Sequence, residues 1–271
     1  MKLIALDSSG LVASAAVYED DLILAEYTVN YKKTHSQTLL PMLDELSKMI
    51  QLDPKSIDAI AVAAGPGSFT GLRIGSATAK GLGLALGKPL IEVPTLAALA
   101  CNLPNADGLL CPIMDARRQQ VYNGLYRFQE QQLVTVQDQR ALSIQELCEE
   151  LNARYEAQDP SDPDALPLPV IFLGDGVAVC RELIDSLLVV PHCYAPANAN
   201  RQRAASVAVL GAEFYNKGLF VNAADHAPIY LRKSQAERER EQQLKTGDTP
   251  QDPFSRAAAT PRVHLTGQEQ K

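Results

Sequence analysis

The sequence has few of the residues from which metal centres and disulfide frameworks are built. Its 271 residues include five cysteines and four histidines. The cysteines are odd in number and lack CxxC spacing, so neither a disulfide framework nor a zinc site is indicated, and we expect reduced thiols in the core. No histidine has a second histidine or a cysteine three or four residues away. This leaves no helical pair of metal ligands, and we expect no bound metal.

Long apolar runs and an excess of positive charge are also missing. The longest apolar stretches are broken by glycine, proline or charge before they reach the roughly 20 residues that a membrane span requires. The N-terminal apolar run ends at Asp7 and is too short for the core of a signal peptide, so we expect a cytoplasmic protein with no membrane partner. The formal net charge of −7 argues against a chain that grips nucleic acid unaided.

The first half of the chain predicts a meander of three short strands followed by alternating helices and strands. Apolar residues alternate with polar ones in the expected strands and recur every three or four positions in the expected helices. In the order strand, strand, strand, helix, strand, helix, strand, the elements are residues 2–7, 12–18, 22–29, 36–52, 57–64, about 70–87 and 90–93.

The same order of elements recurs in the second half. Its expected members are residues 109–116, 120–128, 132–138, 143–155, 169–176, 177–188 and 189–196, with a further helix near 202–217. Ser143 and Glu146 form a capping box that opens one of these helices. Two copies of one βββαβαβ plan predict a duplicated α/β fold whose two lobes face a cleft.

We expect four parts along the chain. Lobe I spans residues 1–102, and lobe II spans residues 103–198 with a mobile loop at 157–168 that is rich in proline and aspartate. Residues 199–233 are expected to form a C-terminal helix and strand that pack back on the lobes. Residues 234–271 have few large apolar side chains and no period, which predicts a disordered tail.

Small residues recur at every fourth position of the helix expected at 70–87. Counting from Gly71, they are Gly75, Ala79 and Gly83, and residues four apart share one helix face. Each interior glycine costs a helix about 0.8–1 kcal/mol relative to alanine, so close backbone approach must offset the loss. That approach is either to the chain's own sheet or to a helix of a partner subunit. The spacing alone leaves both alternatives open.

Turns at the strand ends are candidates for nucleotide contacts. The candidate residues are Asp7, Ser8, Ser9, Gly174, Asp175 and Gly176. Ordinary turn formation explains the same residues. The turn at Gly65 does not match the dinucleotide fingerprint, which would need glycine at Thr70, and Gly87-Lys88 does not match the P-loop, because Pro89 follows it. A GxSxG elbow is absent, and we find no convincing catalytic constellation, so we assign no catalytic residue.

Six segments of the chain carry a family resemblance. They are LIALDSS, SAAV, HSQTLLPMLDELS, AVAAGPGSFTGLRIGSATAKGLGLALGKPLIEVPTLAALA, MDARRQQVY and PIYLR, and they span about residues 1–232. Together they resemble the TsaB (YeaZ) family, non-catalytic paralogues of the TsaD tRNA threonylcarbamoyl transferase. The stretch GPGSFTGLRIG is the most specific, because its length and order are hard to obtain by chance.

The resemblance implies an actin/Hsp70-like (ribonuclease H-like) fold and a scaffold or activating role. The modification concerned places threonylcarbamoyl on N6 of the tRNA adenosine beside the anticodon (t6A). Thr95 and Leu99 stand where the transferase has an HxxxH pair of metal ligands, and neither can ligate a metal effectively, so no activity is expected of the chain alone. No firmly bound cofactor is expected, and ATP or ADP is the candidate ligand within the complex.

The resemblance also implies the partners and the surface that meets them. The partners are a TsaD-like transferase, a TsaE-like ATPase, tRNA only through the complex, and a second copy of the chain when it is alone. The expected interface residues are Leu39, Met42, Leu43, Leu46, Gly71, Gly75, Ala79 and Gly83. The alternative, from another class, is an independent ATP-dependent phosphotransferase of the actin-like superfamily, in which the two candidate turns hold the nucleotide.

Overall fold

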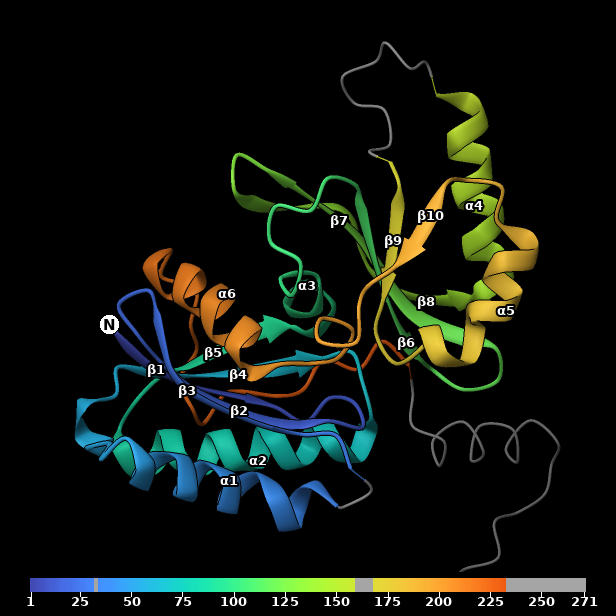
Figure 1. Cartoon of the computed structure of the whole chain (residues 1–271). Coiled ribbons are helices and arrows are strands. Elements are labelled where there is room, and N and C mark those ends of the chain that lie inside the picture. The colour runs from blue at the N-terminus through green and yellow to red at the C-terminus, as the bar shows by residue number, and fades with distance from the viewer. Residues whose placement is uncertain (32–33, 159–167, 233–271) are drawn as a thin grey trace, which may run out of the picture. The chain divides into compact units, whose positions relative to one another are not determined.

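The structure, a computed structural model, describes residues 1–31, 34–158 and 168–232 (Figure 1). All described helices and strands lie in the first of two compact units, Met1–Leu231. The tail predicted at 234–271 and most of the loop predicted at 157–168 lie outside the described residues.

A five-stranded mixed sheet with the order β3-β2-β1-β4-β5 forms the first half of this unit. Its strands are β1 (Lys2–Asp7), β2 (Ala13–Glu19), β3 (Leu22–Val29), β4 (Ala59–Gly65) and β5 (Leu90–Pro94). Strand β1 pairs antiparallel with β2 and parallel with β4, so that Ala5 lies opposite both Ala16 and Ala61. The helices here are α1 (His35–Met49) and α2 (Phe69–Leu86), with a 3₁₀ helix, η1, at Pro54–Ser56.

The second sheet has the order β10-β9-β6-β7-β8. Its strands are β6 (Leu109–Asp115), β7 (Gln120–Gln129), β8 (Gln132–Ser143), β9 (Val170–Leu173) and β10 (His192–Tyr194). The helices that follow β8 and β9 are α4 (Ile144–Ala157), which opens with the predicted capping box, and α5 (Val177–Leu187). Two further helices are α3 (Thr95–Ala100) and α6 (Ala204–Asn216). Among the described residues, no helix is both long and apolar enough to cross a membrane.

The two sheets share one topology, which confirms the predicted duplicated α/β, actin/Hsp70-like fold. In each sheet the first strand lies between an antiparallel second strand and a parallel fourth strand. The sequence analysis missed α3, and it ended β8 five residues early, at 138 instead of Ser143. The C-terminal strand expected within 199–233 is wrong, since Val221 forms only an isolated bridge to Leu90 and Ile229 donates its N–H to the carbonyl of Ala64 at 2.7 Å.

Helices cover both faces of the first sheet. Alternate residues of β1 point to opposite faces: Ile4 and Leu6 join the cluster that contains the buried side chains of α1, whereas Leu3 and Ala5 join the cluster that contains α6. Figure 1 accordingly places α1 and α2 on one side of this sheet and α6 on the other.

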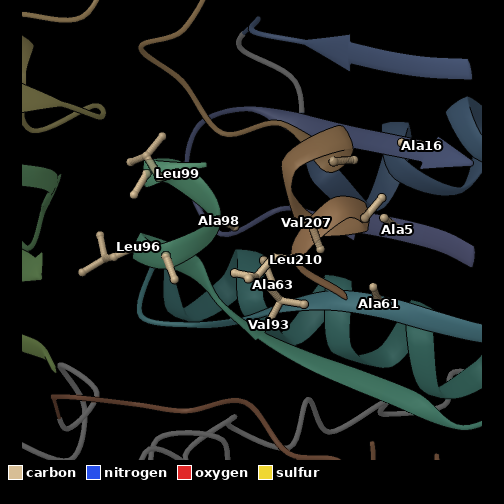
Figure 2. Packing of buried hydrophobic residues seen from close by; sticks show 14 of the residues in the cluster. Ala5, Ala16, Ala61, Ala63, Val93, Leu96, Ala98, Leu99, Val207 and Leu210 are labelled. Atoms are coloured by element: carbon tan, nitrogen blue, oxygen red, sulfur yellow. The ribbon is translucent and has the colours of Figure 1, made fainter. Parts of the chain in front are cut away.

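Small side chains on the sheet let α6 pack closely against it. Ala5, Ala16, Ala61 and Ala63 lie on the face that α6 covers (Figure 2). A Cβ added at Gly211 of α6 would lie 2.8 Å from the Cβ of Ala61, so the helix and strand are already in contact there. Such close packing excludes voids and stabilises the interface by dispersion as well as by apolar burial.

The cysteines are all free in the described structure. Cys111, Cys148 and Cys180 are buried, as expected of core thiols, and burial raises the pKa of each thiol. Cys193 is exposed on the edge strand β10, so the expectation of a core position is wrong for this residue.

The N-terminus of α6 is capped by residues far away in sequence, because Arg203 at the N-cap position offers no side-chain acceptor. The Ala204 N–H donates to Ser14 Oγ at 2.8 Å, and the Ala205 N–H donates to Glu26 Oε1 at 3.1 Å. Glu26 also forms an ion pair with Arg203. A carboxylate beside the positive end of the helix dipole stabilises the helix, so β2 and β3 hold α6 in place.

We expect Glu26→Gln to lower the free energy of unfolding by about 1–2 kcal/mol, because the amide keeps the shape but loses the charge that faces Arg203 and the helix N-terminus. Urea unfolding at neutral pH measures the change. Glu130→Gln, at an exposed turn position, is the control and should leave the midpoint unchanged. Equal midpoints for the two variants would contradict the capping role.

Candidate functional site

The turn that follows β1 is bonded directly to the start of α2. Asp7 Oδ1 accepts hydrogen bonds from the N–H and the hydroxyl of Ser9 at 2.9 and 2.6 Å. The Ser8 hydroxyl donates to the carbonyl of Gly71 at 2.9 Å, and the Ser68 N–H donates to the carbonyl of Ser9 at 2.7 Å. The turn and the helix therefore form one rigid unit.

Asp7 is buried in this turn, with only 1% of its surface exposed. Burial raises the pKa of Asp7 from 3.8 to about 6, and the hydrogen bonds from Ser9 limit the rise. The charge of Asp175 adds to the rise, so the two candidate turns lie within electrostatic range of each other. Burial also raises the pKa of Asp175.

The second turn is held by residues that the sequence analysis did not single out. The Gly174 N–H donates to Asn200 Oδ1 at 2.7 Å, and Arg201 donates to the carbonyl of Gly174 at 3.0 Å. Asp175 Oδ1 accepts from the Asp115 N–H at 3.2 Å. No local sequence signal marks Asn200 and Arg201, because they reach the turn from the segment before α6.

Several N–H groups in and beside the two turns donate to acceptors within the protein. Those of Ser9, Ser68 and Gly174 donate to protein acceptors, and the Gly71 N–H donates to the Ser68 hydroxyl at 3.3 Å, which makes Ser68 the cap of α2. The arrangement does not test nucleotide binding, and the six candidate contacts stay a prediction.

Thr95 and Leu99, which stand where metal ligands are expected in the transferase, lie in the core of this chain. Thr95 and Leu99 lie in α3 and are 0% and 1% exposed. The Thr95 hydroxyl accepts a hydrogen bond from the Gly65 N–H at 3.1 Å, so it supports the glycine turn after β4. Within the described residues there is no group of three or more His, Cys, Asp or Glu side chains that could hold a metal ion.

The small-residue row of α2 faces the chain's own core. A Cβ added at Gly71 would lie 2.1 Å from the carbonyl oxygen of Ser8, and one at Gly75 would lie 2.5 Å from the Ser8 hydroxyl. At Gly83 it would lie 2.5 Å from Leu90. Of the two alternatives that the spacing left open, approach to the chain's own sheet and turn is the one observed.

All eight expected interface residues are buried in the monomer. They are Leu39, Met42, Leu43 and Leu46 of α1 and Gly71, Gly75, Ala79 and Gly83 of α2. The small residues therefore form no exposed groove, because a period of four identifies one face of a helix without saying what that face meets, and the contact of these residues with a partner stays a prediction.

Other residues of the same two helices are exposed. Ala77, Gly81 and Ala85 form an exposed row on α2 beside Leu84, and a Cβ added at Gly81 would have no neighbour within 4 Å. The large apolar side chains exposed on α1 and α2 are Leu40 (55%), Met49 (78%) and Leu84 (60%). We call these six residues the outer face. In the sequence, Ala77, Gly81 and Ala85 also recur at every fourth position, so the same spacing marks this row as well.

The fold and the two turns define the class of protein. Two βββαβαβ lobes with the same strand order, each with a turn at the strand-to-helix junction, form an actin-like α/β protein. Residues 23–240 match the model of the TsaD family, described as tRNA N6-adenosine threonylcarbamoyltransferase.

Individual relatives narrow the class to one branch. The chain is 33% identical over 240 residues to the tRNA threonylcarbamoyladenosine biosynthesis protein TsaB of Bacillus subtilis, covering 88% of this chain and 96% of the relative. For the Escherichia coli protein of the same name, identity is 33% over 132 residues, 48% of this chain and 57% of the relative. The solved structure of YeaZ from Pseudomonas aeruginosa superposes with a TM-score of 0.67 at 25% identity, covering 85% of this chain and 99% of that one. The chain belongs to the TsaB (YeaZ) family.

We expect opposite effects from alanine at two glycines of α2. Gly81→Ala should raise the free energy of unfolding by about 0.5–1 kcal/mol, because the new methyl group meets open space and alanine favours the helix. Gly71→Ala should lower it by about 1–3 kcal/mol, because its methyl group would meet the Ser8 carbonyl. Urea unfolding of both variants measures the difference, and shifts of the same sign would contradict the packing described for α2.

Asp7 should make stability depend on pH with a definite sign. Because the pKa is raised in the folded state, folding takes up a proton between pH 4 and pH 6, so the contribution of Asp7 to stability is greatest below its unfolded pKa of 3.8 and is lost as the pH rises through about 6. Relative to Asp7→Asn, the wild type should gain stability as the pH falls from 7, by up to about 1.4 kcal/mol per pH unit. Unfolding curves at several pH values measure this difference, with the exposed Asp107→Asn as control; parallel pH profiles for wild type and Asp7→Asn would exclude a raised pKa.

Proposed function

We propose that this chain is a non-catalytic subunit of the machinery that makes threonylcarbamoyladenosine in tRNA, and that it pairs with a TsaD-like transferase through the outer face. The name of the Bacillus subtilis relative, which the chain matches over nearly its whole length, supports the pathway. The outer face is the observation that carries the pairing.

The outer face has the composition of a helix-packing surface. Leu84 exposes a large apolar side chain beside the small-residue row of α2, and Leu40 and Met49 expose theirs elsewhere on α1. Exposed apolar side chains on paired helices are candidates for contact with a partner. The row through Gly81 presents almost no side chain, so a helix of a partner can approach the backbone of α2 closely. Two helices from each subunit would then form a four-helix interface, in which methionine adapts to the partner's shape.

The interior of the chain favours a supporting role over a catalytic one. Thr95 and Leu99 are buried as structural side chains, and the N–H groups of Ser9 and Gly174 donate to acceptors within the protein. The TsaE-like ATPase, contact with tRNA through the complex and self-pairing are further proposals that rest on family resemblance. A phosphotransferase remains the alternative, and its support is the electrostatic proximity of Asp7 and Asp175.

Substitutions on the outer face should weaken binding to a TsaD-like transferase without unfolding the chain. We expect Leu84→Asp and Gly81→Leu to raise the Kd at least about tenfold, because one places a charge in an apolar contact and the other blocks close approach. Val179→Asp, at a side chain 68% exposed on α5, is the matched control and should bind normally. Gel filtration and titration of the purified pair measure the effect, and unchanged binding by the folded outer-face variants would remove this surface from the proposal.

Reconstitution tests the function itself. Modification of tRNA by the purified partners should require this chain and should fall with the outer-face variants in proportion to lost binding. Equal modification without the chain would exclude the subunit role. ATP turnover by the chain alone that is abolished by Asp7→Ala would favour the phosphotransferase instead.

A further inference from the structure

A pocket of about 300 Å³ lies away from the candidate turns and from the outer face. It is bounded by α6, by the start of α3 and by β7 and β8 of the second sheet. Its lining residues are Pro94, Ala97, Tyr126, Leu133, Thr135, Asp138, Gln139, Leu210, Glu213, Phe214, Lys217 and Leu231. Leu210 lies in the cluster drawn in Figure 2, where α6 and α3 meet. A volume of this size suits a small molecule of few heavy atoms.

Tyr126 brings an unused hydroxyl to the pocket. Its side chain is 2% exposed, and among the described residues its hydroxyl has no hydrogen-bond partner. Gly124 leaves room for the ring, since a Cβ there would lie 2.7 Å from the hydroxyl oxygen. Burial, assisted by the charge of Asp138, raises the pKa of Tyr126, so the hydroxyl stays protonated. The hydroxyl oxygen is not among the fully enclosed atoms without a partner, so it is open to a hydrogen bond with a ligand or a water.

The charges of the pocket favour a cation. Asp138 lies at the exposed edge of the pocket and forms no ion pair or hydrogen bond with another described residue, whereas Glu213 is paired with Lys217 one helical turn later. The Gln139 side-chain oxygen is already occupied, because it accepts from the Leu96 N–H at 3.0 Å. The lining therefore offers one uncompensated carboxylate, a neutral hydroxyl and an apolar wall of Pro94, Leu133, Leu210 and Phe214.

We propose that this pocket binds a primary ammonium group carried on a short apolar chain, with Asp138 accepting from the ammonium, Tyr126 completing its hydrogen bonds and the aliphatic wall covering the stem. A carboxylate or phosphate would be repelled by Asp138. A neutral alcohol would gain the apolar contacts but not the charge-assisted hydrogen bond to Asp138. Free amines and lysine side chains share this chemistry, and the proposal does not depend on the role in tRNA modification.

A matched series of six-carbon probes tests the proposal on the full chain. The probes are n-hexylammonium, 1-hexanol and hexanoate, titrated by NMR to about 20 mM, since ligands of this size bind weakly. Hexylammonium should bind about fivefold more tightly than hexanol and should shift signals of Ala97 and Leu133, while hexanoate should not bind. Nα-acetyl-lysine amide is the fourth probe. If it binds, the pocket also accepts lysine side chains of proteins; if it does not, the pocket accepts only free amines.

Variants separate recognition from folding. Asp138→Asn should weaken hexylammonium binding about fivefold while leaving hexanol binding unchanged, and Tyr126→Phe should weaken hexylammonium binding about twofold. Glu149→Gln, at an exposed acid on α4, is the control for net charge and should bind as the wild type does. Urea unfolding checks that each variant is folded. Equal binding of hexylammonium and hexanol, no binding of either, or full affinity in folded Asp138→Asn would each overturn the proposal.

Discussion

The close approach of the turn after β1 to helix α2 is the constraint on which the first lobe depends. The carbonyl of Ser8 lies where Gly71 would carry a Cβ, and the carbonyl of Ser9 lies where Gly67 would carry one, at 2.1 and 2.3 Å. Any side chain at these positions would force the helix away from the sheet. Glycine is unfavourable in a helix, but the close packing of α2 against the turn offsets that free-energy cost.

Several features of the molecule follow from this contact. The turn buries the carboxylate of Asp7 together with the hydroxyls of Ser8 and Ser9, and their hydrogen bonds are made within the protein. The N–H groups of Ser68 and Gly71 at the start of α2 also donate to acceptors within the protein. With its inner face fixed, α2 must present Ala77, Gly81 and Ala85 to solvent. The same contact therefore shapes both the candidate site and the outer face.

The sequence predicts the helices and strands whose apolar residues recur with a clear period. It does not predict features that depend on contacts with residues far away in the chain. Strands β1 to β5 and helix α2 follow the alternation and the four-residue spacing closely. Helix α3 was missed because its six residues, TLAALA, are all buried and have no polar face to reveal a period. The spacing of glycines located the right helix, but only the register of the helix against Ser8 decides which of its faces is buried.

Residues 199–203 connect the two lobes of the duplicated plan. Asn200 and Arg201 hold the turn at Gly174, Arg203 pairs with Glu26 of β3, and Gln202, 1% exposed, lies against Gly10 of the first turn.

Asn102 fixes this segment from the end of lobe I by donating to the carbonyls of Ala199 and Arg201 at 3.0 and 2.6 Å. Residues 199–203 thus contact both halves through side chains that belong to no predicted strand, helix or motif. Asn200 and Arg201 bond to the turn at Gly174, Gln202 lies against Gly10, and Arg203 leads into α6, so the connection before α6 joins the two halves by direct contact.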